Sequence, residues 1–234
     1  MPYAKNESIN IYYEVEGDGP PLVLQHGFTR DLSDWRDFGY VAALKNDYQL
    51  ILVDARGHGS SDKPHHPEAY SSKVRVGDIL AVLDALSLDE TNFLGYSVGG
   101  WIGFALAEHA PERLSSLAIG GIHPYKREPG PLNERVEMLR NEAPDPDGND
   151  SEALIASTLG IRDDPGFANV LDTFKAPCLV YVGENDGLAK LASETSKDQS
   201  HVTFVTLPGL DHPHAFFQSE KVLPCIREFF AIGS

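Results

Sequence analysis

TNFLGYSVGG, residues 91–100, joins a short apolar run to a serine that lies between two glycines. Gly95 to Gly99 match the G-x-S-x-G pattern, in which a strand turns sharply into a helix and holds the serine in a strained conformation. Such a turn brings the backbone two residues before and two residues after Ser97 close together, so both positions need glycine, which has no Cβ atom. The first N–H groups of the following helix would point back at Ser97. The pattern therefore predicts a site where negative charge can develop on an oxygen atom.

The residues on either side of this pattern agree with a strand-to-helix turn. Phe93 and Leu94 precede it as the end of a strand. Ala105 and Ala107 lie in a run of good helix formers that extends to Pro111. Because five-residue patterns recur by chance, this context is what favours a functional turn over an ordinary one.

The chain upstream carries strand and helix signals. Residues 2–24 alternate between polar and apolar and contain the turn GDGPP, which predicts a hairpin followed by a buried strand. Residues 35–44 are expected to be helical, with Ser33 or Asp34 as the N-cap. The nearly continuous apolar run YQLILVD, residues 48–54, predicts a strand covered on both faces.

Strands and helices then alternate as far as residue 121. A Gly/Ser/Pro/His loop over residues 54–67 precedes a helix predicted for 71–86. The turn at Ser97 and its helix follow, and then an apolar strand at 114–120. This order predicts an α/β fold with parallel strands.

Residues 122–175 interrupt the alternation, because they are rich in proline, glycine and acidic groups. We expect up to three short helices here, in LNERVEMLR, SEALIAST and FANVLDTF, with residues 143–150 as a hinge or loop. They hold too few apolar residues for a separate core, which predicts a small lid on the main sheet of one domain, 1–234. Regular structure resumes with strands at 177–183 and 202–207 and helices at 188–196 and 215–232.

Composition excludes several classes of protein. The formal net charge of −16, from 35 acidic and 19 basic residues, argues against nucleic-acid or anionic-membrane partners and favours a small neutral substrate. No apolar run approaches the ~20 residues of a membrane helix, and no signal sequence is visible, so we expect a cytoplasmic protein. Cys178 and Cys225 are expected to be buried free thiols. The sequence does not indicate an oligomeric state.

A serine hydroxyl needs a base, and the base needs an acid to orient it. In an open parallel sheet such groups follow strands. Asp186 comes three residues after the strand that ends at Gly183, and His212 follows the next strand. The order Ser97, Asp186, His212 is the one expected for this architecture.

The chain resembles the serine members of the α/β-hydrolase superfamily over nearly its whole length. The resemblance is carried by HGF at 26–28, DARGHGSSD at 54–62, GYSVGG at 95–100, and GEND at 183–186 with LPGLDH at 207–212. It implies a mostly parallel sheet of about eight strands with helices on both faces. Relatives often have a larger helical cap at 122–175, so a small or open pocket is expected here.

The same resemblance implies roles for individual residues. Ser97 would be the nucleophile, His212 the base and Asp186 the acid that orients it. The backbone N–H groups of Phe28 and Val98 would form the oxyanion hole, and their side chains would border the substrate.

Other residues remain alternatives for these roles. His214 is a rival for the base, and Glu184 and Asp211 are rivals for the acid. His26 and His58 are expected to form structural hydrogen bonds. Trp35 and Trp101 suit a pocket and the core equally well. The histidine pairs at 65–66 and 212/214 lack ligand spacing, and the phosphate-binding glycine patterns do not occur, so neither a metal nor a cofactor is expected.

Serine at position 97 argues against dehalogenase and epoxide hydrolase types, which use aspartate there. The first hypothesis is hydrolysis of carboxylic esters, lactones or thioesters through an acyl-enzyme. A carbon–carbon bond hydrolase or a perhydrolase using the same triad is an alternative. A non-enzymatic ligand sensor or signalling partner is another.

Overall fold

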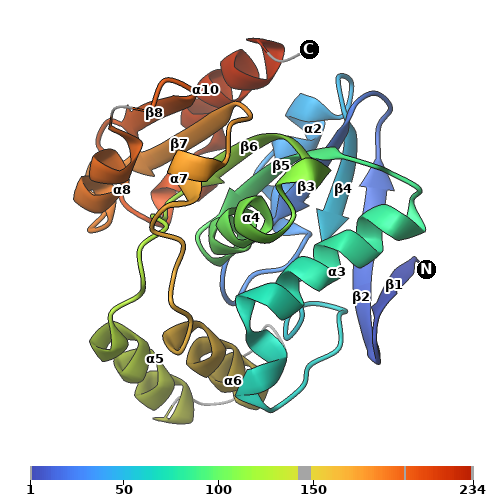
Figure 1. Cartoon of the computed structure of the whole chain (residues 1–234), viewed down its shortest axis with the longest axis vertical. Helices are drawn as coiled ribbons and strands as arrows, with labels where there is room; N and C mark the ends of the chain where they lie inside the picture. The colour runs from blue at the N-terminus through green and yellow to red at the C-terminus, as the bar shows by residue number, and fades with distance from the viewer. Residues whose placement is uncertain (1, 142–148, 198, 233–234) are drawn as a thin grey trace.

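The computed structural model of the chain describes residues 2–141, 149–197 and 199–232. In that part of the chain, eight strands form one sheet (Figure 1). The strands are β1 (Tyr3–Asn6), β2 (Ile9–Glu16), β3 (Pro21–Gln25), β4 (Gln49–Val53), β5 (Thr91–Tyr96), β6 (Leu114–Gly120), β7 (Cys178–Gly183) and β8 (Val202–Leu207).

The sheet has the order β1-β2-β4-β3-β5-β6-β7-β8. The pairs β1–β2 and β2–β4 are antiparallel, and every pair from β4–β3 to β7–β8 is parallel. In register, Val23 of β3 lies opposite Ile51 of β4 and Phe93 of β5. The predicted α/β fold with a mostly parallel sheet of about eight strands is therefore confirmed.

Helices lie between these strands and after the last one. They are α1 (Asp34–Asp37), α2 (Tyr40–Leu44), α3 (Ser72–Ala85), α4 (Val98–His109), α5 (Pro129–Asn141), α6 (Ser151–Arg162), α7 (Val170–Thr173), α8 (Ala189–Ser196), α9 (His214–Phe217) and α10 (Ser219–Ile232), with 3-10 turns η1 (Pro67–Tyr70) and η2 (Pro111–Arg113).

Helices cover both faces of the sheet, and the side chains of each strand divide between two cores. In β4, Ile51 and Val53 join α3 and α4, whereas Leu50 and Leu52 join α1, α2 and α10. Alternate side chains of a strand point to opposite faces, so a strand buried on both sides becomes continuously apolar. That is why YQLILVD could be identified as a buried strand.

The segment between β6 and β7 holds α5, α6 and α7. In Figure 1, α5 and α6 lie beyond the sheet, near one end of α3. We expected this segment to lie on the main sheet, but its main packing partners are helical elements: α6 packs against η1 and α5, and α7 packs against α4. Its apolar side chains nevertheless join the core of the α3/α4 face, among them Leu132, Ile161 and Phe167. Of the proposed hinge at 143–150, residues 143–148 lie outside the described residues.

Two predicted helices are divided in the structure. Gly39 interrupts the helix predicted for 35–44 because its φ is +84°, a left-handed conformation that separates α1 from α2. Ser33 precedes α1, but its side chain makes no capping hydrogen bond. The helix predicted for 215–232 is broken at Gln218, where α9 ends and α10 begins.

Within the described residues, no helix has both the length and the apolar character needed to cross a bilayer. Cys178 and Cys225 are both free, but only Cys178 is fully buried.

Candidate active site

Ser97 joins β5 to α4 and has φ 53° and ψ −113°, which a residue with a side chain rarely adopts. The two glycines make this turn possible for different reasons. A Cβ on Gly95 would lie 2.4 Å from the carbonyl oxygen of Gly99, as the sequence predicts. A Cβ on Gly99 would instead lie 2.1 Å from the carbonyl oxygen of Gln25, at the end of β3. Gly99 is therefore needed for contact with the neighbouring strand.

Two other predicted residues lie beside this serine. His212 Nε2 is 3.0 Å from Ser97 Oγ, and His212 Nδ1 is 2.7 Å from Asp186 Oδ2. The side chain of Asp186 is 3% exposed, and its other carboxylate oxygen accepts a hydrogen bond from the N–H of Leu188 at 2.9 Å. The structure thus brings together three side chains that are 26 and 115 residues apart in sequence.

Phe28 lines the same cavity as Ser97, and Val98 is the next residue in the chain. Phe28 lies in the loop after β3, and Val98 is the first residue of α4. In the described part of the chain, neither N–H group donates a backbone hydrogen bond, which leaves both available to an oxygen atom at Ser97. The N-terminus of the 12-residue α4 adds the positive end of its dipole at the same place.

A cavity of about 330 Å³ opens at this site. Ser97 and His212 lie in it, and most of the other lining side chains are apolar or aromatic: Phe28, Tyr96, Pro213, Phe216 and Phe217 contribute, together with Gly27, Thr29, Arg30 and Arg135. A second, narrow cavity of about 20 Å³ also reaches Ser97 and is lined in part by the lid residues Leu132 and Ile161. Two cavities therefore adjoin Ser97.

A family model for the α/β-hydrolase fold matches residues 20–159. The chain belongs to this family. The match covers more than half of the chain and includes the turn at Ser97.

Individual relatives of this α/β-hydrolase-fold protein include a protein of Azorhizobium caulinodans whose name proposes a carbamate hydrolase, RutD. It is 35% identical over 140 residues, which are 60% of this chain and 51% of the relative. The chain thus spans about half the length of the curated relatives it matches first.

Two solved structures share the fold over nearly their whole length. The enol-lactonase from Burkholderia xenovorans LB400 has a TM-score of 0.88 at 23% identity, covering 98% of this chain and 100% of that one. A thermophilic esterase from Thermogutta terrifontis has a TM-score of 0.87 at 22% identity, covering 99% and 98%.

The rival residues form hydrogen bonds with other groups. His214 Nδ1 is 2.6 Å from Asp211 Oδ1, so these two side chains pair with each other in this α/β-hydrolase chain. Glu184 accepts a hydrogen bond from the N–H of Gly209 at 2.9 Å, which ties the loop that carries His212 to the end of β7.

Tyr96 was not singled out from the sequence. Its hydroxyl donates a hydrogen bond to the carbonyl oxygen of His212, and its ring centroid lies 5.5 Å from that of the imidazole. The residue before the serine therefore holds the backbone of the histidine loop. Tyr96 occupies a variable position of the G-x-S-x-G pattern, so the pattern does not predict this contact.

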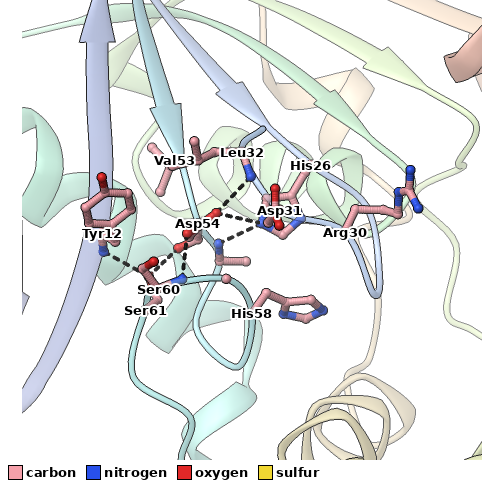
Figure 2. Close-up of polar contacts among 12 residues, drawn as sticks. Tyr12, His26, Arg30, Asp31, Leu32, Val53, Asp54, His58, Ser60 and Ser61 are labelled. Carbon is pink, nitrogen blue, oxygen red and sulfur yellow. Dashed lines mark hydrogen bonds and ion pairs between the residues drawn. The ribbon is translucent and has the colours of Figure 1, made fainter. Parts of the chain in front are cut away.

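A polar network fixes the loop that carries Phe28 (Figure 2). The buried carboxylate of Asp54 accepts hydrogen bonds from the N–H groups of Leu32 at 2.8 Å and Ser60 at 2.7 Å. His26 Nε2 accepts one from the N–H of Ala55 at 3.0 Å, so this nitrogen carries no proton. Burial lowers the pKa of His26, which favours the neutral ring that this bond requires.

His58 lies against the same loop and is fully buried. Its Nδ1 is 3.2 Å from the carbonyl oxygen of Arg56, and its ring meets the ring of Phe28 edge-on at 5.7 Å. Burial holds the pKa of His58 well below its usual value. The HGF and DARGHGSSD motifs thus link two loops through these buried groups.

The two tryptophans differ in location. Trp35 is completely buried among Tyr40 and Phe216. Trp101 is also buried, but it lines the narrow cavity beside Ser97. Its ring centroid lies 4.9 Å from that of Phe167. Trp101 is therefore both in the core and beside a cavity, the two locations that the sequence suggested, whereas Trp35 is in the core.

The histidine pairs do not form part of a metal-binding cluster. Across residues 2–141, 149–197 and 199–232, no group of three or more His, Cys, Asp or Glu side chains is arranged to hold a metal ion. His65 instead pairs with Asp150 and Glu152 at 2.8 and 3.0 Å, which links the loop after β4 to the start of α6.

Proposed function

We propose that this protein hydrolyses carboxylic esters, including lactones or thioesters, through an acyl-enzyme intermediate. The observation that carries the proposal is the continuous hydrogen-bonded chain from Ser97 through His212 to Asp186. In this chain the imidazole can accept a proton from the hydroxyl while its other nitrogen stays bonded to a buried carboxylate.

The first half of the reaction forms the acyl-enzyme. Ser97 Oγ attacks the carbonyl carbon and its proton passes to His212 Nε2. The carbonyl oxygen becomes an oxyanion that accepts hydrogen bonds from the N–H groups of Phe28 and Val98. Donors of this kind are typically worth ~10²–10³ in rate each. The bond to the leaving group then breaks, and the proton on Nε2 passes to the leaving oxygen or sulfur.

The second half repeats these steps with water. His212 Nε2 takes a proton from a water molecule as the water oxygen attacks the acyl carbon. The bond between the acyl carbon and Ser97 Oγ then breaks. The proton returns to the serine oxygen, and the carboxylic acid leaves. Throughout, Asp186 accepts the hydrogen bond from Nδ1–H and stabilises the imidazolium without taking its proton.

The relatives and the cavity support this reaction class. The names of the matched proteins refer to a carbamate, an ester and an enol-lactone, each of which has a carbonyl carbon bound to a heteroatom. The cavity of about 330 Å³ suits a small substrate. The net charge of −16 favours a neutral acyl substrate over a polyanionic one, although arginines line the cavity.

Turnover of short acyl esters of 4-nitrophenol tests the proposal. We expect rapid release of 4-nitrophenol from the wild type and a loss of more than ~10³-fold in Ser97→Ala. A serine-directed phosphonate should label Ser97 in a stoichiometric reaction that mass spectrometry can locate. Ser193→Ala, which changes a serine on α8, is the matched control and should leave turnover and labelling unchanged.

Slow turnover would contradict the proposal. A wild-type turnover rate below about one per minute on every 4-nitrophenyl ester tested would favour the alternative of a non-enzymatic ligand sensor. Hydrolysis that persists in Ser97→Ala would place the chemistry elsewhere in the protein.

A further inference from the structure

Two arginines lie beside the proposed nucleophile. Arg127, between β6 and α5, and Arg135, on α5, both line the narrow cavity that contains Ser97 and Val98. Arg135 also lines the larger cavity, where its guanidinium carbon is 4.7 Å from the centroid of the Phe28 ring. The small lid thus places two positive charges at the site.

Neither guanidinium has a carboxylate partner within residues 2–141, 149–197 and 199–232. Nη1 of Arg127 is buried and makes no hydrogen bond there. By contrast, six other arginines form ion pairs with Asp or Glu: Arg30, Arg36, Arg56, Arg113, Arg140 and Arg162. Arg75 and Arg227 also lack an ion pair, but both donate hydrogen bonds to neighbouring oxygen atoms. Among the described residues, the guanidinium groups of Arg127 and Arg135 have neither kind of partner.

The position of these charges is electrostatically unfavourable without an anion. Burial lowers the pKa of Arg127 and of Arg135, and the repulsion from Arg127 lowers the pKa of Arg135 further. Asp186 opposes the shift at Arg127, but its carboxylate oxygens already bond His212 and the N–H of Leu188. Arginine does not lose its proton in proteins, so the two charges persist.

We propose that the substrate carries a carboxylate in addition to the bond that is cleaved, and that Arg127 and Arg135 bind this carboxylate. Guanidinium groups pair with carboxylates through two parallel N–H···O bonds. The narrow cavity of about 20 Å³ has room for a group of about the size of one water molecule, such as a carboxylate oxygen.

This inference rests on the proposed ester hydrolysis and changes one part of it, the neutral substrate. The expectation of a neutral substrate came from the net charge of the whole chain. Exposed charges that are farther from the substrate than the Debye length of ~10 Å are largely screened. The two arginines line the cavity that contains Ser97, so they would lie close to a bound substrate. The local charge is therefore the better guide to the substrate.

Matched ester pairs test this inference. Mono(4-nitrophenyl) glutarate is compared with 4-nitrophenyl pentanoate, and 4-acetoxybenzoate with 4-acetoxybenzamide, so that the carboxylate lies on the acyl side or on the alcohol side. We expect the wild type to prefer the charged member of at least one pair by tenfold or more in kcat/KM. That preference should fall by about tenfold or more in Arg127→Gln and Arg135→Gln, as expected for a lost charge-assisted hydrogen bond.

Arg140→Gln is the matched control, because Arg140 lies on the same helix but pairs with Glu137 on the exposed surface. It makes the same change in net charge and should leave the ratio of the two kcat/KM values unchanged. No preference in either pair would overturn the inference, as would a preference that survives in both cavity variants. Hydrolysis of the neutral esters that depends on Ser97 would then still support the proposed function.

Binding of glutarate gives a readout without turnover. We expect glutarate to raise the thermal midpoint of the wild type and of Ser97→Ala, and to have no effect on the Arg127→Gln/Arg135→Gln double variant. Circular dichroism checks that the double variant is folded, and the Arg127→Gln and Arg135→Gln single variants, each expected to show a smaller shift than the wild type, serve if it is not. If glutarate does not bind the folded wild type, the inference is wrong even where esters are not hydrolysed.

Discussion

Asp186 is the most enclosed member of the hydrogen-bonded chain at the site. Its oxygens bond His212 Nδ1 and the N–H of Leu188, so the carboxylate is fixed at the end of β7. His212 is more exposed and depends on neighbours for its position. Tyr96 bonds its carbonyl oxygen, and Glu184 bonds Gly209 in the same loop. The base is thus positioned through both its ring and its backbone.

Asp186→Asn should lower kcat by about 10³–10⁴-fold with a small change in KM. An amide that turns its NH₂ group toward Nδ1 would leave the imidazole proton on Nε2, so the ring could not accept a proton from Ser97. Steady-state kinetics with a neutral 4-nitrophenyl ester would measure this split. Asp211→Asn is the control, since Asp211 pairs with His214, and it should stay within about twofold of the wild type. A kcat for Asp186→Asn within tenfold of the wild type would contradict this role.

At the scale of elements, the site depends on how closely α4 approaches the end of β3. A Cβ on Gly99 would lie 2.1 Å from the carbonyl oxygen of Gln25 and 2.6 Å from that of His26. These are backbone atoms and cannot rotate away. The contact brings the N–H of Val98, on α4, near the loop that carries the N–H of Phe28 after β3. One glycine therefore sets the distance between the two proposed oxyanion donors.

Gly99→Ala should reduce the free energy of unfolding by roughly 1–3 kcal/mol and lower kcat/KM, because the overpacked turn must move α4 away from β3. Urea denaturation and ester kinetics would measure the two effects. Gly130→Ala on α5 is the matched control: a Cβ there has nothing within 4 Å. It should leave stability unchanged or raise it by up to about 1 kcal/mol. If the two variants had the same free energy of unfolding and the same kcat/KM, the close approach of α4 to β3 would not be required for stability or activity.

At the scale of the whole molecule, buried neutral histidines link stability to pH. Burial lowers the pKa of His26 and His58, and it lowers the pKa of His123 to about 4. His123 Nδ1 accepts a hydrogen bond from the N–H of Tyr125 at 3.2 Å, which protonation of that nitrogen would break. These side chains remain neutral in the folded protein at a pH where they gain a proton in the unfolded chain.

The free energy of unfolding should therefore fall as the pH is lowered from 7 to 5. The unfolded histidines take up protons near pH 6.5, and the folded ones do so only at lower pH, so stability is fully present above about 6.5 and is lost below it. Each such group contributes a slope of up to about 1.4 kcal/mol per pH unit. Urea denaturation at pH 7, 6 and 5 would measure the trend.

The His123→Asn variant isolates one contribution, because an amide oxygen can replace Nδ1 as the acceptor but does not titrate. Its stability should depend less steeply on pH than that of the wild type. Burial raises the pKa of Asp34 and Asp54, which gives the opposite slope in the lower range where these carboxyls titrate. Constant or rising stability between pH 7 and 5.5 would contradict the histidine account.

The sequence alone determined the features that depend on neighbouring residues or on alternation along a strand. The apolar runs predicted the central strands, since each lies between two helix layers, and the two glycines around Ser97 predicted the turn. The positions of Asp186 and His212 after strands predicted their meeting with Ser97, because parallel strands end at a common edge.

Only the tertiary structure decided which polar groups meet across the fold and where the lid lies. The pairing of His214 with Asp211, the contact of Tyr96 with the histidine loop, and the position of Gly99 against Gln25 all depend on distances between elements. Arg127 and Arg135 gave no sequence signal, because an arginine on an exposed helix and one beside a cavity look alike in a sequence. Their significance comes from their half-buried position beside Ser97 and from the carboxylate partners they lack among the described residues.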